Sequence, residues 1–182
     1  MDLKGKRIAF LMANEGVEQI ELTEPWKAVE EAGGQPVLIA PEAGQVQAFN
    51  HLDRADTFPV DETVGTADAS SFAGLMLPGG VANPDHLRTV PEAVDFVQSF
   101  FAAGKPVAAI CHAAWMLVEA GGVKGRTVTS WPSVQTDIRN AGGTWVDEEV
   151  HTDNGLVTSR KPDDLPSFCK KMLEEFAEGR HS

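Results

Sequence analysis

The residue with the clearest chemical potential is Cys111, which follows an apolar run at residues 107–110 and precedes a helical pattern at residues 113–120. This is the layout of a nucleophile elbow, which needs small residues two positions before and after the nucleophile; here they are Ala109 and Ala113. Because free N–H groups at a helix start stabilise a thiolate, we expect a lowered thiol pKa. A lone cysteine is also often a small buried hydrophobic residue, so position alone leaves both interpretations open.

A second candidate segment is Leu77-Pro78-Gly79-Gly80, at the end of another apolar run. Glycines at this place let backbone N–H groups approach a ligand closely, as an oxyanion hole requires. Taken alone, Pro-Gly-Gly is more often only a turn.

An acidic cluster follows the first apolar run: Glu15, Glu18, Glu21 and Glu24, with Pro25 predicted in the first turn of a helix. Acidic residues favour helix N-termini and usually do nothing more there. The first strand of a doubly wound sheet is typically central, however, so its carboxyl end would face the same crevice as the cysteine. A partly buried glutamate there would have a raised pKa and could hold a proton for the sulfur or pass one to a substrate.

Apolar runs of strand length that could position these groups occur at residues 7–13, 35–40, 74–77 and 106–110. Helical spacing with terminal glycines separates them, at residues 22–29 and 93–101. This alternation predicts an α/β fold with a doubly wound, mostly parallel sheet between two layers of helices.

The remaining segments are less regular. Residues 45–61 are more polar and are expected to form a small β extension outside the main sheet. We predict a short helix at 113–120, a strand at 127–129, a helix at 134–141, and short strands around Val150 and Val157. Residues 165–176 are predicted to form an amphipathic helix whose apolar stripe includes Cys169, so that cysteine is interpreted as core.

Composition limits the function classes. With 182 residues and 42% apolar content, we expect one domain, residues 1–182. The net charge of −12 argues against nucleic acid and anionic membrane as partners. No apolar run is long enough to span a bilayer or act as a signal segment, and the 2 cysteines make no disulfide framework, so we expect a cytoplasmic protein.

In combination, these segments resemble the PfpI family of intracellular cysteine hydrolases and stress proteins. That family lies in the superfamily that also contains class I glutamine amidotransferases and the Parkinson's-associated deglycase. The resemblance covers nearly the whole chain, and the segments that carry it are Ala13-Asn14-Glu15 with Glu18, Glu21 and Pro25, then Leu77-Pro78-Gly79-Gly80, Gly104-Lys105-Pro106-Val107, Ile110-Cys111-His112, Gly125-Arg126, Asn140-Ala141-Gly142, Asp147-Glu148-Glu149-Val150 and Ser159-Arg160.

The resemblance implies a flavodoxin-like fold with Cys111 as the nucleophile and Glu21 beside the thiol, Glu18 being the next candidate. It further implies backbone donors near Gly80 and His112, no metal, no cofactor, and a homodimer or higher homo-oligomer that shapes the site.

The chain departs from the family pattern in two places. Ala113-Ala114 follows His112 where many members have Gly-Pro, and the loop at residues 81–85 differs from the usual Arg-Ala-Pro-Glu type. In the protease members an acid from that loop is thought to reach a neighbouring subunit's site. Asp85 would have to replace that acid, which weakens a peptidase interpretation.

Other candidates are weaker. Adjacent side chains at an elbow usually diverge, so the His112 imidazole need not meet the sulfur, and its role as a base stays open. Trp131 is either a packing residue or part of a pocket wall, as is Trp115. A glutamine amidotransferase would need a late histidine over Cys111, and His151 is the only plausible one. Its alternation with Glu149 and Asp153 is typical of the solvent face of an edge strand, which also argues against these three residues as metal ligands. The remaining histidines have no evident partners: His51, His86 and His181.

Two classes of function fit. The first is a cysteine-dependent enzyme acting on carbonyl electrophiles, such as small α-oxoaldehydes or their adducts on proteins, as glyoxalases and deglycases do; an intracellular cysteine peptidase acting on peptides is the close alternative. The second is an oxidative-stress sensor or protective protein that works through oxidation of Cys111.

Overall fold

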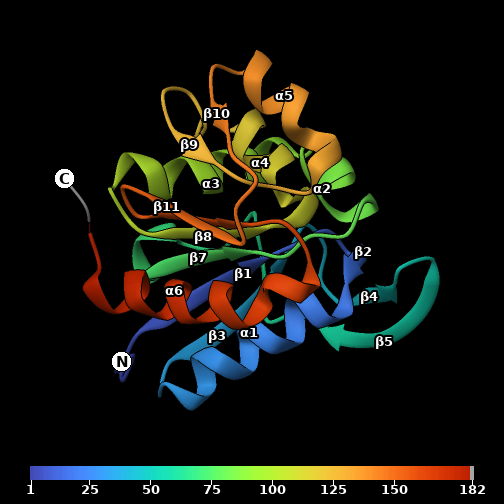
Figure 1. Cartoon of the computed structure of the whole chain (residues 1–182). Coiled ribbons are helices and arrows are strands. Elements are labelled where there is room, and N and C mark those ends of the chain that lie inside the picture. Colours follow the sequence, from blue (N-terminus) through green and yellow to red (C-terminus); the bar gives the residue numbers. More distant parts are fainter. Residues whose placement is uncertain (181–182) are drawn as a thin grey trace.

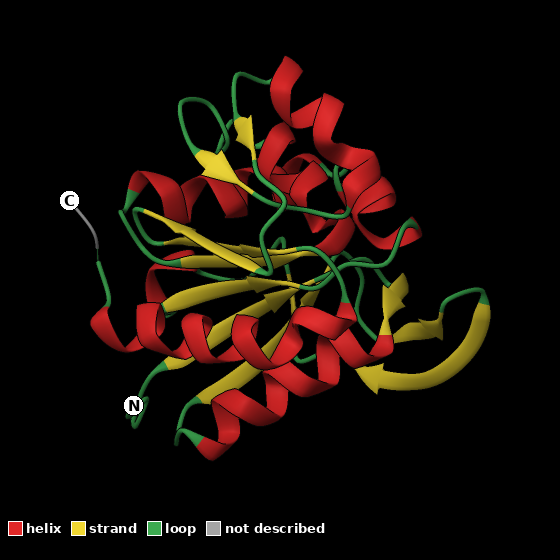
Figure 2. Cartoon of the chain, viewed as in Figure 1, coloured by secondary structure: helices red, strands yellow, loops and turns green. Residues whose placement is uncertain are grey.

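The computed structural model describes residues 1–180, which are built around a seven-stranded sheet (Figures 1 and 2). All neighbouring strands in this sheet are parallel except β11 and β12, which form an antiparallel pair at one edge. In the order in which they lie, the strands are β11 (Val150–Asp153), β12 (Leu156–Ser159), β8 (Val107–Ile110), β7 (Gly74–Leu77), β1 (Arg7–Leu11), β3 (Gln35–Ala40) and β6 (Glu62–Thr63).

The central strands are apolar because both of their faces are covered. In β1, Ile8 and Phe10 face one core cluster, whereas Ala9 and Leu11 face the other. The strands predicted at 35–40 and 74–77 have the expected bounds, whereas β1 ends before residue 13 and β8 begins one residue late.

Helices cover both faces of the sheet, as Figure 1 shows. Residues of α1 and α6 pack in one core cluster, and those of α2, α3, α4 and α5 pack in the other. The helices are α1 (Gln19–Glu31), α2 (Ala82–Leu87), α3 (Pro91–Ala102), α4 (Ala114–Glu119), α5 (Gln135–Asn140) and α6 (Leu165–Glu178). The chain thus has the predicted flavodoxin-like, three-layer α/β fold.

Helix α1 corrects one prediction. It begins at Gln19, so Pro25 lies inside the helix and not in its first turn. The acidic residues before it are also not a helix start, because Glu15–Glu18 forms a short strand, β2. The conformation of this segment depends on its pairing with another strand, which its acidic composition does not indicate.

Strand β2 belongs to a small second sheet with β4 (Gln45–Asn50) and β5 (Asp53–Pro59). The β4–β5 hairpin is the extension predicted from residues 45–61, and Figure 2 shows it projecting beyond the main sheet. A third, parallel pair joins β9 (Thr127–Val128) to β10 (Thr144–Trp145).

Helix α6 has the predicted amphipathic packing. Phe168, Met172 and Phe176 are fully buried against the sheet, and Cys169 is partly buried beside them. No helix within residues 1–180 is both long and apolar enough to cross a bilayer.

Candidate active site

Cys111 stands at the turn between β8 and α4, as the elbow motif predicts. Its φ is 63°, a left-handed conformation that is uncommon for a residue with a side chain. A single 3-10 turn, Cys111–Ala113, leads into α4. The N–H of Trp131 donates to the carbonyl oxygen of Cys111 at 3.2 Å and helps to hold this backbone in place.

Glu21 is the acidic residue that the fold places beside the thiol. It comes from the first turns of α1 and is fully buried. Its Oε2 atom accepts a hydrogen bond of 2.9 Å from the N–H of Gly79. Its Oε1 atom is buried with no hydrogen-bond partner among the described residues, and the carboxyl group interacts electrostatically with Cys111.

Gly79 makes this proximity possible. A Cβ atom at position 79 would overlap the Glu21 carboxyl group and would lie 2.8 Å from the Cβ of Cys111. Because the Gly79 N–H is already donated to Glu21, it is not available to an oxyanion, and this corrects the role expected for that glycine. The N–H of Gly80 instead interacts with the sulfur.

The Glu21 carboxyl group holds a proton at neutral pH. Burial raises its pKa to about 8, with a further increase from the charge of Glu18 and an opposing effect of the Gly79 hydrogen bond. The raised pKa expected of a buried glutamate is therefore present at Glu21.

The thiol itself departs from expectation. Burial raises the pKa of Cys111, and the Glu21 carboxylate adds to this, although the N–H groups of His112 and Gly80 act in the opposite direction. The lowered pKa predicted from a helix start is wrong, because the sulfur is withdrawn from solvent and α4 is only 6 residues long. A base must therefore take the thiol proton when sulfur attacks.

His112 is placed to be that base. Its Nδ1 atom lies 3.1 Å from the Cys111 Sγ atom, so the expected divergence of the two side chains is wrong. Aromatic packing explains the difference: the imidazole stacks on Trp131 at 5.6 Å and contacts Trp115 at 5.2 Å. Burial lowers the His112 pKa, which favours the neutral ring that accepts protons.

These groups open into a cavity of about 640 Å³ at the carboxyl ends of the central strands. Most of the predicted site residues line it, whereas Gly79 and Ala113 are buried and do not. The lining residues are Glu15, Gly16, Glu18, Glu21, Phe49, His51, Leu52, Gly80, Val81, Ala82, Asp85, Cys111, His112, Trp131 and Pro162.

The β4–β5 hairpin contributes a part of the wall that sequence reasoning missed. His51 and Leu52 lie at its tip, and the His51 N–H donates to the Glu18 carboxylate at 3.0 Å. His51 has a φ of 58°, in the left-handed region, and the local sequence did not predict this conformation.

Asn83 is a second residue that the sequence did not reveal. It is buried in α2, where its Oδ1 accepts from the N–H of Ala13 at 2.7 Å. Its Nδ2 donates to the carbonyl oxygens of Pro78 and Gly79, each at 2.9 Å. One side chain thus joins the end of β1 to the glycine turn after β7.

The remaining candidates lie elsewhere. His151 is on the edge strand β11 and pairs with Glu148 at 2.7 Å, so it does not reach the cavity. Asp153 accepts a hydrogen bond from the Thr127 N–H. No group of three or more potential metal ligands occurs within residues 1–180. His181 lies outside the described residues.

The chain is similar in sequence to known proteins over nearly its whole length. The chain is 39% identical over 168 residues to "Putative cysteine protease YraA" of Bacillus subtilis, covering 92% of this chain and 96% of that protein. It is 36% identical over 168 residues to "Deglycase PH1704" of Pyrococcus horikoshii, covering 92% of this chain and 98% of that protein.

The fold is also similar to that of solved structures. The crystal structure of Drosophila melanogaster DJ-1beta superposes with a TM-score of 0.85 at 26% identity, covering 97% of this chain and 91% of that chain. The model of the DJ-1/PfpI family matches residues 6–175, a span that includes β1, the Gly79-Gly80 turn and the Cys111 elbow. A cysteine elbow with a buried glutamate, on this fold and with these relatives, makes the chain a member of the DJ-1/PfpI family.

Proposed function

We propose that this protein is a cysteine-dependent enzyme of the glutathione-independent glyoxalase or protein deglycase type. Its substrates are small carbonyl electrophiles or the adducts that they form on proteins, and Cys111 is the nucleophile. The observation that carries the proposal is the buried, protonated Glu21 carboxyl beside a thiol that also contacts His112.

The groups present can be assigned to the steps of an α-oxoaldehyde isomerisation. The thiol proton passes to His112 while Sγ bonds to the aldehyde carbon, giving a hemithioacetal. As the hemithioacetal forms, Glu21 gives its own proton to the aldehyde oxygen and becomes a carboxylate. This carboxylate takes the proton from the attacked carbon and returns it to the neighbouring carbon through an enediol. The resulting thioester reacts with water, which releases the 2-hydroxy acid and restores the thiol.

Stabilisation of the developing oxyanion is assigned to the backbone. The N–H groups of Gly80 and His112 already interact with the Cys111 sulfur, so they lie within reach of an oxygen on the carbon that sulfur attacks. No cofactor takes part in this sequence.

A cysteine peptidase is the second candidate, and the contact between Cys111 and His112 favours it. A histidine that accepts the thiol proton can return it to a leaving amine. Asp85 lines the same cavity and would have to orient that histidine or act across a subunit interface.

We further propose that the chain forms a homodimer or higher homo-oligomer. Leu52 and Val81 stand at the cavity mouth with 94% and 57% of their surfaces exposed, which is unusual for apolar residues beside a site. Light scattering of the purified protein would test this proposal, and a monomer at micromolar concentration would contradict it.

The enzymatic proposal is tested by incubation with methylglyoxal in the absence of glutathione while lactate is followed. Wild-type protein and a Cys169→Ala variant should both form lactate, and Cys111→Ala should form none. Cys169 is a matched control because it is partly buried on α6 and does not line the cavity.

If all three proteins are inactive, methylglyoxal isomerisation is ruled out. The same set should then be tested on a glycated peptide and on an unmodified peptide, because turnover of the second alone would identify a peptidase. Peroxide-driven oxidation of Cys111 without turnover of any substrate would identify the sensor.

A further inference from the structure

The cavity that holds Cys111 is lined by acidic groups and by no lysine or arginine among the described residues. Its carboxyl-bearing side chains are Glu15, Glu18, Glu21 and Asp85. Glu21 differs from the other three, because it is fully buried and burial raises its pKa to about 8.

The charge at the mouth is largely uncompensated. Glu15 has a basic partner, Arg54, at 3.0 Å. Glu18 accepts hydrogen bonds only from the backbone N–H of His51, and the Asp85 side chain has no ion-pair partner within residues 1–180. Two histidines also line the wall: burial favours the uncharged form of His112, and His51 contacts Glu18 through its backbone N–H.

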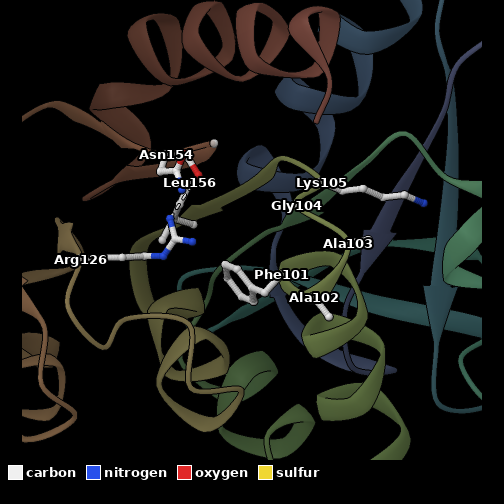
Figure 3. A pocket seen from close by; sticks show the side chains of 9 residues that line it. Phe101, Ala102, Ala103, Gly104, Lys105, Arg126, Asn154 and Leu156 are labelled. Carbon is white, nitrogen blue, oxygen red and sulfur yellow. Dashed lines mark hydrogen bonds between the residues drawn. The ribbon is translucent and has the colours of Figure 1, made fainter. Parts of the chain in front are cut away.

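At the opposite end of the sheet, the charged side chains that line a hollow are basic. A hollow of about 350 Å³ there is lined by Lys105 and Arg126, near the amino ends of β8 and β12 (Figure 3). Arg126 donates to the carbonyl oxygens of Asp153 and Asn154, and Lys105 donates to backbone carbonyls of residues 69, 70 and 72. These cations therefore hold the fold together and leave the charge of the Cys111 cavity unbalanced.

We propose that the Cys111 cavity selects neutral and cationic carbonyl compounds, in particular adducts carried on basic peptides, and rejects substrates that bear a carboxylate close to the reacting carbon. This selection rests on the proposed function for its chemistry. A cleft lined by charge of one sign raises the local concentration of the opposite charge by about tenfold or more, and lowers that of like charge.

Glu18 and Asp85 are the residues that set this selectivity. Both lie at the cavity wall, on β2 and α2, and neither carboxyl group has a basic partner within residues 1–180. A substrate with a guanidinium or ammonium group a few ångströms from its carbonyl would place that group between them. A carboxylate in the same position would meet two like charges.

The test uses thiol reagents of matched size, so that it does not depend on turnover. Trimethylammonioethyl methanethiosulfonate is cationic and sulfonatoethyl methanethiosulfonate is anionic. In each case Sγ bonds to the reagent's sulfenyl sulfur, a disulfide forms, and methanesulfinate leaves. The protein carries Cys169→Ala so that only Cys111 reacts, and β-mercaptoethanol provides the reference ratio for a neutral thiol.

We expect the ratio of cation to anion rates at Cys111 to exceed the reference by about tenfold or more at low salt, and to fall as salt is added. The double variant Glu18→Gln with Asp85→Asn should bring the ratio close to the reference. Because both reagents meet the same thiol, any change in thiol ionisation cancels in the ratio.

Asp95→Asn is the matched control, since it removes one exposed charge on α3, which does not line the cavity; its ratio should equal that of the parent protein. A parent ratio equal to the reference, or one that the double variant leaves unchanged, overturns the proposal. If the protein does not convert methylglyoxal but the rate ratio is as expected, the proposed reaction is contradicted and the proposed charge selection is still supported.

Discussion

The Nδ1 atom of His112 lies 3.1 Å from the Sγ atom of Cys111, although the two residues are neighbours in the chain. Such a contact needs a cause outside the turn itself. The cause is the stacking of the imidazole on Trp131, whose own N–H is bonded to the carbonyl oxygen of Cys111. One residue thus fixes both the backbone of the nucleophile and the ring of its proposed base.

Replacing Trp131 tests this positioning role. Trp131→Ala should lower kcat about fivefold, because loss of an aromatic stack worth about 1 kcal/mol frees the imidazole to turn from the sulfur. The backbone hydrogen bond to Cys111 survives the substitution. Trp131→Phe should restore most of kcat, and the pH profile of alkylation at Cys111 should shift in the alanine variant alone. Equal effects of alanine and phenylalanine would contradict a role for stacking.

Glu21 should leave a mark on the pH dependence of stability. Its folded pKa of about 8 lies above its ordinary value of 4.5, so its contribution is complete below pH 4.5 and is lost as pH rises toward 8. Within this window the free energy of unfolding should fall by about 1.4 kcal/mol per pH unit from this group.

Glu21→Gln keeps an acceptor for the Gly79 N–H but cannot ionise. The difference between the urea-unfolding curves of wild type and variant, measured from pH 5 to pH 8, isolates the glutamate from other titrating groups. Parallel dependence on pH in the two proteins would show that Glu21 is ionised in the folded state.

Gly79 should not tolerate a side chain. Gly79→Ala places a methyl group against the Glu21 carboxyl and the Cys111 Cβ, and we expect a loss of about 1–3 kcal/mol of stability with at least a tenfold loss of turnover. Gly65→Ala is a suitable control, since a Cβ there has no atom within 4 Å. A fully active and stable Gly79→Ala protein would show that the carboxyl and the thiol are farther apart than the structure places them.

Asn83 should be essential for stability. Asn83→Ala leaves the Ala13 N–H and the Pro78 carbonyl oxygen without their side-chain partner, while the Gly79 carbonyl oxygen keeps only the Glu18 N–H. We expect a loss of about 2–4 kcal/mol in thermal or urea unfolding. Asn140→Ala, at an exposed position of α5, should change stability by less than about 0.5 kcal/mol. Similar effects at both sites would contradict the joining role of Asn83.

The apolar runs were enough to predict the sheet and its helices, because central strands buried on both faces leave a continuous hydrophobic signal. They also placed Cys111 at the end of β8. The strand β2 escaped prediction because its pairing with β4 depends on a partner some 30 residues away in the chain, at Gln47 and Phe49.

The environment of the thiol was harder to predict than its position. The motif indicated a helix start and hence a low pKa, but burial outweighs a helix of 6 residues. Neither the contact with His112 nor the hydrogen bonds of Asn83 has a local sequence signature, because each depends on where a third element packs.

The three parts of the site follow three different strands: Glu21 comes after β1, the Gly79-Gly80 turn after β7, and Cys111 after β8. No stretch of chain contains the site by itself, so it comes into existence only when these strands lie side by side. Closing such long-range contacts is slow in folding. During synthesis and refolding the thiol therefore passes through a period without its carboxyl neighbour, exposed to whatever oxidants and aldehydes the surroundings contain.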